Sequence, residues 1–301
     1  MKLKPGAIGE RDAFGIIAPA GPVTPDELQE GIELIKASGH PVVLGRNIFK
    51  AGTYLAGDDE ARLQDLHEMF LDRRVKAIMC ARGGYGSLRL LDKLDYESIG
   101  KNAKVFIGYS DITALLLAIY HRTGLITFHG PVLRDLTKNK GRNWEALRDV
   151  LLSGREFRLD LTGARVVRPG RARGVLMGGN LSLLCHMMGT PFTPSLKGKI
   201  LFLEERGETP YRLDRMATHL RLCGGFEAVS GILLGSFLDC GESSSIREMF
   251  SDILSGLGIP VVSGIPLGHG EENITVPVGV EAEMDTEEMH LVALETCTRP
   301  Q

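Results

Sequence analysis

A single serine stands where the chain changes from a strand-like to a helix-like apolar segment. In VFIGYSDITALLLAIY (105–120), Ser110 separates a short apolar run from a longer one of helical character. The hydroxyl can cap the helix, because a serine oxygen accepts a hydrogen bond from an N–H group at a helix start. It can instead be a nucleophile, because a sharp turn between strand and helix exposes Oγ beside N–H groups that stabilise an oxyanion. The segment GYSDI has only the first glycine of G-x-S-x-G, so both interpretations stay open at this point.

A nucleophilic serine needs a general base and an acid that orients that base. His269 is one of eight histidines, and it lies in PLGHG, a loop that follows a predicted strand. A loop histidine is ordinarily solvated, but glycine on both sides allows another group to approach it closely. Glu204 and Glu205 follow the apolar run 200–203. Because strand side chains alternate between faces, only one of the two can face the same crevice as His269.

A glycine-rich loop follows the predicted strand 75–80. Its sequence ARGGYGS (81–87) contains Gly83, Gly84 and Gly86. The loop can be a plain turn, since glycine adopts positive φ without a steric penalty. Alternatively, it directs a backbone N–H towards negative charge that develops beside Ser110.

Several other classes of site are excluded by motif. The chain has no G-x-x-x-x-G-K-[ST], its GGYGS lacks the spacing of a dinucleotide fold, and His67-Glu68 lacks the second histidine of H-E-x-x-H. No clustered His, Asp and Glu residues show the spacing of metal ligands, so no metal and no cofactor are expected. The five cysteines form no C-x-x-C pair, which argues against a disulfide framework and a structural zinc site (Cys80, Cys185, Cys223, Cys240 and Cys297).

Composition narrows the class of protein further. A formal charge of -3 and a pI of about 6.3 give no basic footprint for nucleic acid. The apolar runs fall short of the ~20 residues that a membrane helix needs. The start of the chain lacks the apolar core of a signal peptide. We therefore expect a soluble cytoplasmic protein that binds neither nucleic acid nor a membrane.

The elements that position these residues alternate in the first half of the chain. Strands are predicted at 14–18, 41–44, 75–80 and 105–107, and helices from Pro25, over 58–71, around 88–91 and over 112–121. This alternation is typical of βαβ units with a parallel sheet. In such sheets the loops after the strands form the binding crevice. Both the glycine loop and Ser110 fall at such positions.

The pattern changes at 155–172, where short alternating runs are interrupted by Pro-Gly, as in a linker or at the edge of a second unit. Strands are predicted at 200–203, 231–237 and 260–264, helices at 211–223 and 246–257, and antiparallel strands at 275–280 and 289–294. We expect an α/β protein with a parallel-sheet, flavodoxin-like N-terminal domain (1–155), a linker (156–170) and a smaller mixed α/β C-terminal domain (171–301).

A series of spaced motifs extends over essentially the whole chain: IIAPAGPV, ARGGYGS, GYSD, ITFHGP, GVLMGGNLSLL, LFLEERGETPYRLDRM, IPLGHGEEN and VPVG. In this order they resemble the motifs of the LD-carboxypeptidases of serine peptidase family S66, the muramoyl-tetrapeptide carboxypeptidases. The resemblance implies a serine on an N-terminal elbow, and a glutamate and a histidine on a C-terminal domain.

By motif, the resemblance assigns Ser110 as nucleophile, His269 as base and Glu204 as the acid that orients the base. It also implies an oxyanion hole made of the backbone N–H groups of Gly84 and Asp111. A Ser-His-Glu triad forms an acyl-enzyme without a metal, and the chain order of its members is free to vary.

The implied substrate is a small peptide derived from peptidoglycan, whose terminal D-alanine is released during cell-wall recycling. Arg82 and Asn180 are placed by position alone as polar residues that contact it, and Glu205 stands where many relatives have aspartate. A homodimer is the expected assembly. Two alternatives remain: an amidase resembling the microcin-immunity branch of the same family, and a non-catalytic ligand-binding α/β protein. The sequence leaves open whether diaminopimelate or lysine is preferred at the third peptide position.

Overall fold

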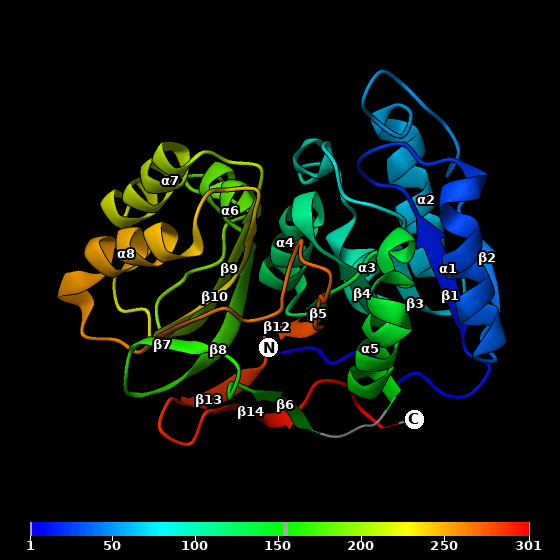
Figure 1. Cartoon of the computed structure of the whole chain (residues 1–301). Coiled ribbons are helices and arrows are strands. Elements are labelled where there is room, and N and C mark those ends of the chain that lie inside the picture. Colours follow the sequence, from blue (N-terminus) through cyan, green and yellow to red (C-terminus); the bar gives the residue numbers. More distant parts are fainter. Residues whose placement is uncertain (1, 153–155, 301) are drawn as a thin grey trace.

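The computed structural model describes residues 2–152 and 156–300, which form two β-sheets that lie side by side (Figure 1). The first sheet has the strand order β12-β5-β4-β3-β1-β2. Its bounds are β1 Ala13–Ile17, β2 Val42–Leu44, β3 Val75–Cys80, β4 Val105–Gly108, β5 Thr127–His129 and β12 Val276–Val278.

Strands β1 to β5 are parallel to one another. The order 2-1-3-4-5 is that of flavodoxin-like folds, so the expected parallel sheet is confirmed. The sixth strand, β12, is antiparallel to β5 and comes from the other end of the chain.

Five helices accompany the first sheet: α1 Pro25–Ala37, α2 Asp59–Leu71, α3 Tyr96–Lys101, α4 Thr113–Thr123 and α5 Arg142–Leu152. α1 begins at a capping box in which Thr24 and Glu27 satisfy each other's backbone N–H groups. The helix expected around 88–91 is instead a 3-10 turn, η1 Ser87–Leu90, followed by the short α3. Further 3-10 turns are η2 Ser110–Ile112, η3 Leu133–Asp135, η4 Lys138–Gly141 and η5 Ser255–Leu257.

The second sheet is mixed and has the order β6-β14-β13-β8-β9-β10-β11-β7. Its bounds are β6 Glu156–Asp160, β7 Arg165–Arg168, β8 Arg171–Asn180, β9 Lys199–Arg206, β10 Gly231–Leu238, β11 Val261–Ser263, β13 Glu281–Asp285 and β14 His290–Thr296. The parallel strands are β8 to β11, and the others run antiparallel to their neighbours. The segment 156–170 thus contributes β6 and β7, the two edge strands of this sheet.

Helices α6 Leu181–Met187, α7 Pro210–Leu222 and α8 Ser243–Ile253 gather on one side of the second sheet (Figure 1). The two halves meet where α4 packs against β8 and α6. Gly179 permits this contact, because a Cβ at this position would lie within 2.6 Å of the methyl carbon of Thr113. The carboxyl ends of β4 and β9 consequently face the same space.

Candidate active site

Ser110 lies at a strained turn between β4 and α4. Its φ of +63° is in the left-handed region, which is costly for a residue with a Cβ. Gly108 allows the chain to turn here, since a Cβ on it would lie 2.6 Å from Ile112. Neither η2 nor α4 has a side-chain cap, so the serine hydroxyl does not serve the helix. The local structure is therefore a sharp strand-to-helix turn, the geometry that a nucleophile elbow requires.

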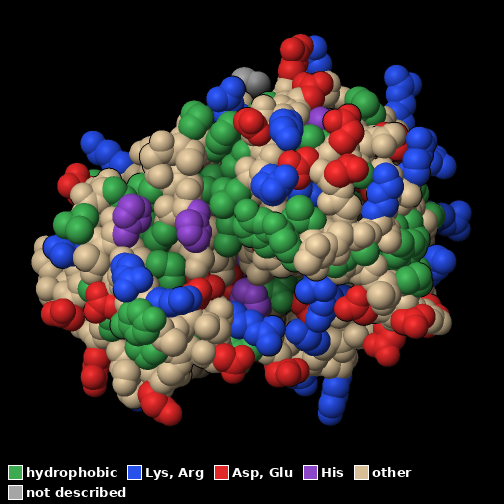
Figure 2. Space-filling view, turned by 90° about the horizontal axis from the view of Figure 1, so that it is seen from above, with side chains coloured by type: hydrophobic (Ala, Val, Ile, Leu, Met, Phe, Trp, Pro, Cys, Tyr) green, Lys and Arg blue, Asp and Glu red, His purple; other side chains and the backbone are tan. Residues whose placement is uncertain are grey.

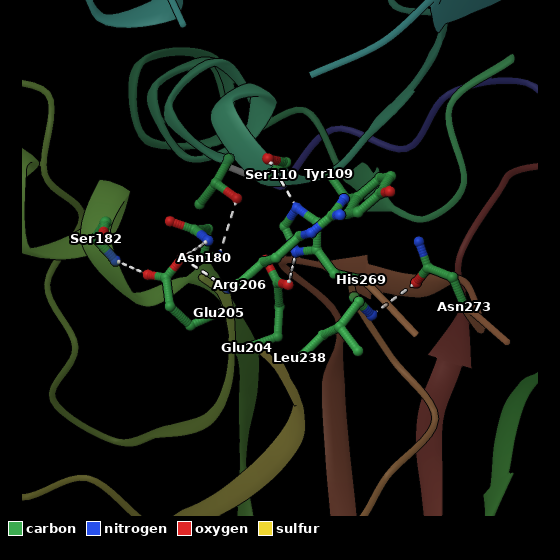
Figure 3. Close-up of polar contacts among 12 residues, drawn as sticks. Tyr109, Ser110, Asn180, Ser182, Glu204, Glu205, Arg206, Leu238, His269 and Asn273 are labelled. Atoms are coloured by element: carbon green, nitrogen blue, oxygen red, sulfur yellow. Dashed lines mark hydrogen bonds and ion pairs between the residues drawn. The ribbon is translucent and has the colours of Figure 1, made fainter. Parts of the chain in front are cut away.

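The Ser110 hydroxyl is directed at His269, as Figure 3 shows. Oγ lies 3.1 Å from His269 Nε2, and His269 Nδ1 lies 2.6 Å from Glu204 Oε2. An ionised carboxylate only accepts hydrogen bonds, so Nδ1–H donates to Glu204 and Nε2 accepts from the serine. The imidazole also packs edge-on against Tyr109, with ring centroids 4.9 Å apart.

The loop that carries His269 fits closely over Glu204. Gly268 has a φ of +96°, and a Cβ on it would lie 2.7 Å from Glu204 Cβ and clash with the carboxylate. The Gly268 N–H donates to Asn273 Oδ1 at 2.9 Å, which closes the loop. The glycine that made His269 a candidate thus allows the histidine to approach its acid.

Glu204 lies near the end of β9 and is completely buried. Burial by itself raises the pKa of its carboxyl, but the nearby imidazoles of His129 and His269 outweigh burial and lower the pKa to about 2. The carboxylate is therefore ionised and points its Oε2 at His269.

Glu205, the neighbouring acid, points elsewhere and belongs to a structural network. It accepts hydrogen bonds from Asn180 Nδ2 at 2.7 Å and from the N–H groups of Ser182 and Arg206 at 2.8 and 2.9 Å. Asn180 also caps α6, with its Oδ1 accepting the Leu183 N–H. Both polar atoms of the buried Asn180 side chain are thus engaged within the protein, and Asn180 is not among the described residues that line the cleft.

The glycine loop passes directly beside the serine. A Cβ on Gly83 would lie 2.8 Å from Ser110 Cβ, so only glycine fits at this contact. The N–H groups of Gly84 and Asp111 make no hydrogen bond with any other described residue. The Asp111 carboxylate is buried, which raises its pKa, and it accepts the Ser87 N–H at 2.8 Å. This bond ties the glycine loop to the serine turn.

Basic side chains surround the opening of the cleft. Arg82, Arg134, Lys138 and Arg206 line it, and Asp135 is the one carboxylate among its described lining residues. Figure 2 shows a hollow between the two halves that contains a histidine, with Lys and Arg side chains along its rim. Of these residues only Arg82 was expected.

The Asp135 carboxylate is already engaged, because Lys138 lies 2.8 Å away and the Tyr109 hydroxyl donates to it at 2.6 Å. Burial, followed by the charge of Asp135, raises the pKa of Tyr109. Basic side chains therefore outnumber acidic ones among the described residues that line the cleft, although Arg134 and Arg206 also pair with Glu27 and Asp239.

Comparison with known proteins places this geometry in context. Two family models match, the LD-carboxypeptidase N-terminal domain over residues 14–130 and the LD-carboxypeptidase C-terminal domain over residues 173–284. The chain is 39% identical to the probable murein peptide carboxypeptidase of Bacillus subtilis, over 96% of this chain and 93% of the relative.

Solved structures agree with these matches. The muramoyltetrapeptide carboxypeptidase from Oxalobacter formigenes superposes with a TM-score of 0.84 and 32% identity, covering 93% of this chain and 97% of that one. The microcin C7 self-immunity protein MccF, in complex with aspartyl sulfamoyl adenosine, gives a TM-score of 0.92 at 28% identity, covering 99% and 100%.

Proposed function

Because the chain belongs to the LD-carboxypeptidase family, peptidase S66, we propose that it is a serine hydrolase that releases terminal D-alanine from peptidoglycan-derived tetrapeptides. The observation that carries this proposal is the continuous hydrogen-bond chain from Ser110 through His269 to the buried Glu204. A non-catalytic binding protein has no use for a strained serine aimed at a histidine.

The reaction follows from the roles of these three groups. Ser110 Oγ attacks the carbonyl carbon of the L,D-peptide bond while His269 Nε2 takes the serine proton. The backbone N–H groups of Gly84 and Asp111 receive the negative charge that forms on the carbonyl oxygen. His269 then gives its proton to the amine of departing D-alanine, and water hydrolyses the acyl-enzyme in the reverse sense. Glu204 stabilises the imidazolium throughout.

A carboxypeptidase must also bind the terminal carboxylate of its substrate. We assign this role to the basic rim, with Arg82 as the first candidate because it adjoins the glycine loop that passes Ser110. The Arg82 guanidinium is held by a hydrogen bond from Nη1 to the Pro22 carbonyl at 2.9 Å. A fixed guanidinium recognises a carboxylate at a smaller entropic cost than a mobile one.

The proposal is tested by incubating the purified protein with L-Ala-γ-D-Glu-meso-diaminopimelate-D-Ala and measuring free D-alanine. The protein should release D-alanine and leave the tripeptide, and Ser110→Ala should abolish release. Absence of product with this peptide and with its lysine counterpart would contradict the proposal. EDTA should not reduce the rate, since no metal takes part in the mechanism.

A second candidate activity is cleavage of an aminoacyl sulfamoyl nucleoside. It is favoured by the superposition on MccF bound to aspartyl sulfamoyl adenosine. Aspartyl sulfamoyl adenosine should be hydrolysed much more slowly than the tetrapeptide. The reverse order of kcat/KM values would favour this second activity.

Among the described residues, no helix combines the length and the apolar character that crossing a membrane requires. We propose that the enzyme works in the cytoplasm, where recovered wall peptides are recycled, and that it forms a homodimer. Cell fractionation tests the first statement, and sedimentation equilibrium of the purified protein tests the second.

A further inference from the structure

His129 is buried directly behind Glu204 and takes no part in the chemistry described above. It is the last residue of β5 and has no exposed surface. Its ring packs edge-on against Tyr109 and Phe202, with centroids 6.1 and 5.2 Å away. Its Nε2 lies 3.9 Å from Glu204 Oε1, the carboxylate oxygen that His269 does not use.

Both ring nitrogens of His129 lack a hydrogen-bond partner among the described residues, and so does Glu204 Oε1. Burying such groups without partners is costly, and a phenylalanine would fill the same aromatic position without that cost. Two polar groups that both lack partners therefore face each other inside the protein. This arrangement calls for a role of the imidazole that depends on its nitrogen.

We propose that His129 is a positioning residue that presents Nε2–H to Glu204 Oε1 and so holds the carboxylate in the orientation that serves His269. The inference rests on the proposed function. Each carboxylate oxygen then faces one imidazole, Oε2 that of His269 and Oε1 that of His129. The distance of 3.9 Å exceeds a hydrogen bond, and such contacts in free enzymes tighten when substrate closes the site.

Other groups around His129 carry no charge that could replace Glu204 in this role, although Asn273 Nδ2 and Thr275 Oγ1 are also buried without hydrogen-bond partners among the described residues. The Tyr109 hydroxyl donates to Asp135, so it is directed away from the imidazole. Asn273 and Thr275, on the segment that leads into β12, are neutral side chains. Glu204, with His269 beyond it, is therefore the charged group that His129 faces.

The matched variants are His129→Phe, which keeps the ring shape, and His129→Gln, whose amide N–H can replace Nε2–H. Loss of a hydrogen bond to a charged group should lower kcat/KM for the tetrapeptide by about 10- to 100-fold in His129→Phe. His129→Gln should recover most of that loss. Equal activity of the two variants, or wild-type activity of His129→Phe, would overturn the proposal.

The pH profile separates positioning from packing. Without the donor, the Glu204 carboxylate is held less well against His269 Nδ1, so it stabilises the His269 imidazolium less. The low-pH limb of the kcat/KM profile should therefore move to lower pH in His129→Phe and return in His129→Gln. Phe128→Leu is the control, since its side chain points to the opposite face of β5 and should leave the limb in place.

A readout without substrate keeps this test independent of the proposed function. The ¹⁵N spectrum of the wild-type histidines should show a neutral His129 whose proton is on Nε2. A bare Nε2 would overturn the positioning role even if the enzyme releases D-alanine. A protonated Nε2 in a protein that releases none would instead contradict the proposed function alone.

Discussion

At the scale of single residues, the backbone strain at Ser110 and the chemical role of its hydroxyl can be tested separately. A φ of +63° strains any residue with a Cβ, and the Ser110 Oγ makes no capping hydrogen bond that would offset this strain. Ser110→Ala should leave the free energy of unfolding nearly unchanged, because alanine keeps the strain. Ser110→Gly should raise it by about 1 kcal/mol, because glycine adopts this conformation freely. Both variants should release no D-alanine.

Urea denaturation of the three proteins, followed by circular dichroism, measures this difference. If Ser110→Ala lowered the free energy of unfolding by more than about 1 kcal/mol, the serine hydroxyl would have a capping role. D-alanine release by either folded variant at the wild-type rate would show that another group is the nucleophile.

The two adjacent glutamates differ in what they contact, and their variants should differ accordingly. Glu204→Gln should remain folded and lose roughly 10³- to 10⁴-fold in kcat, because the amide cannot stabilise the imidazolium. Glu205→Gln should lose about 1–3 kcal/mol of stability, because an amide oxygen is a weaker acceptor for the N–H groups it now binds. Its kcat should change little. Kinetics at a temperature where both are folded test this, and exchanged phenotypes would contradict the assignment.

At the scale of elements, glycines in the loops decide how closely the side chains that we propose to be catalytic can approach one another. Gly268 and Gly264 both have positive φ, of +96° and +82°, but only a Cβ on Gly268 would meet Glu204. Gly268→Ala should therefore displace His269 and reduce kcat/KM by at least about 100-fold, as small misplacements do. Gly264→Ala carries the backbone strain alone, and should lose about 1 kcal/mol of stability while its activity persists.

Equal activity of the two glycine variants would mean that the His269 loop adapts to a Cβ without losing its geometry. A crystal structure of Gly268→Ala would then show where the loop has moved. The comparison is informative because both glycines belong to the same loop region after β11.

The sequence predicted elements well where their pattern was regular. The Thr24 cap, the alternating strands β1, β3 and β4, and the Ser110 turn follow from local signals. The ten-residue β8 was missed, because its arginines and glycines have the composition of a loop. Those glycines serve packing, since a Cβ on Gly174 would lie 3.2 Å from the Ile200 nitrogen of the neighbouring strand.

Long-range contacts explain the remaining differences at the site. Asn180 comes at the end of β8, a position from which its amide could face the cleft or cap α6. Its contact with Glu205 of β9, which is distant in sequence, decides for the cap. Arg134 and Lys138 reach the cleft from one segment and Arg206 from the end of β9, and no local pattern connects the two. The motifs, in contrast, predicted Ser110, Glu204 and His269 as a set from local signals. Ser110 and Glu204 each follow a strongly apolar run, and His269 lies between two glycines.

At the scale of the whole molecule, the site is assembled from both sheets. Ser110 follows β4 of the first sheet, whereas Glu204 belongs to β9 of the second. We propose that residues 1–155 and 171–301 are two domains, with the site between them. They are not separable in sequence, because β12 returns to pair with β5. A protein cut in the 161–164 turn should therefore stay associated and active, and fragments that separate on gel filtration would contradict this.

The buried Glu204 charge also makes the stability of the molecule depend on pH. Its pKa is lowered from 4.5 to about 2 in the folded state, so it contributes stability above pH 4.5 that is lost as the pH falls towards 2. The difference in free energy of unfolding between wild type and Glu204→Gln should therefore shrink as the pH decreases from about 5 to about 3. Gly264→Ala, which changes no charge, should stay parallel to wild type over the same range. Urea denaturation at several pH values measures both differences. If the Glu204→Gln curve also ran parallel to wild type, Glu204 would not be held ionised inside the fold, and the electrostatic basis of the triad would fail with it.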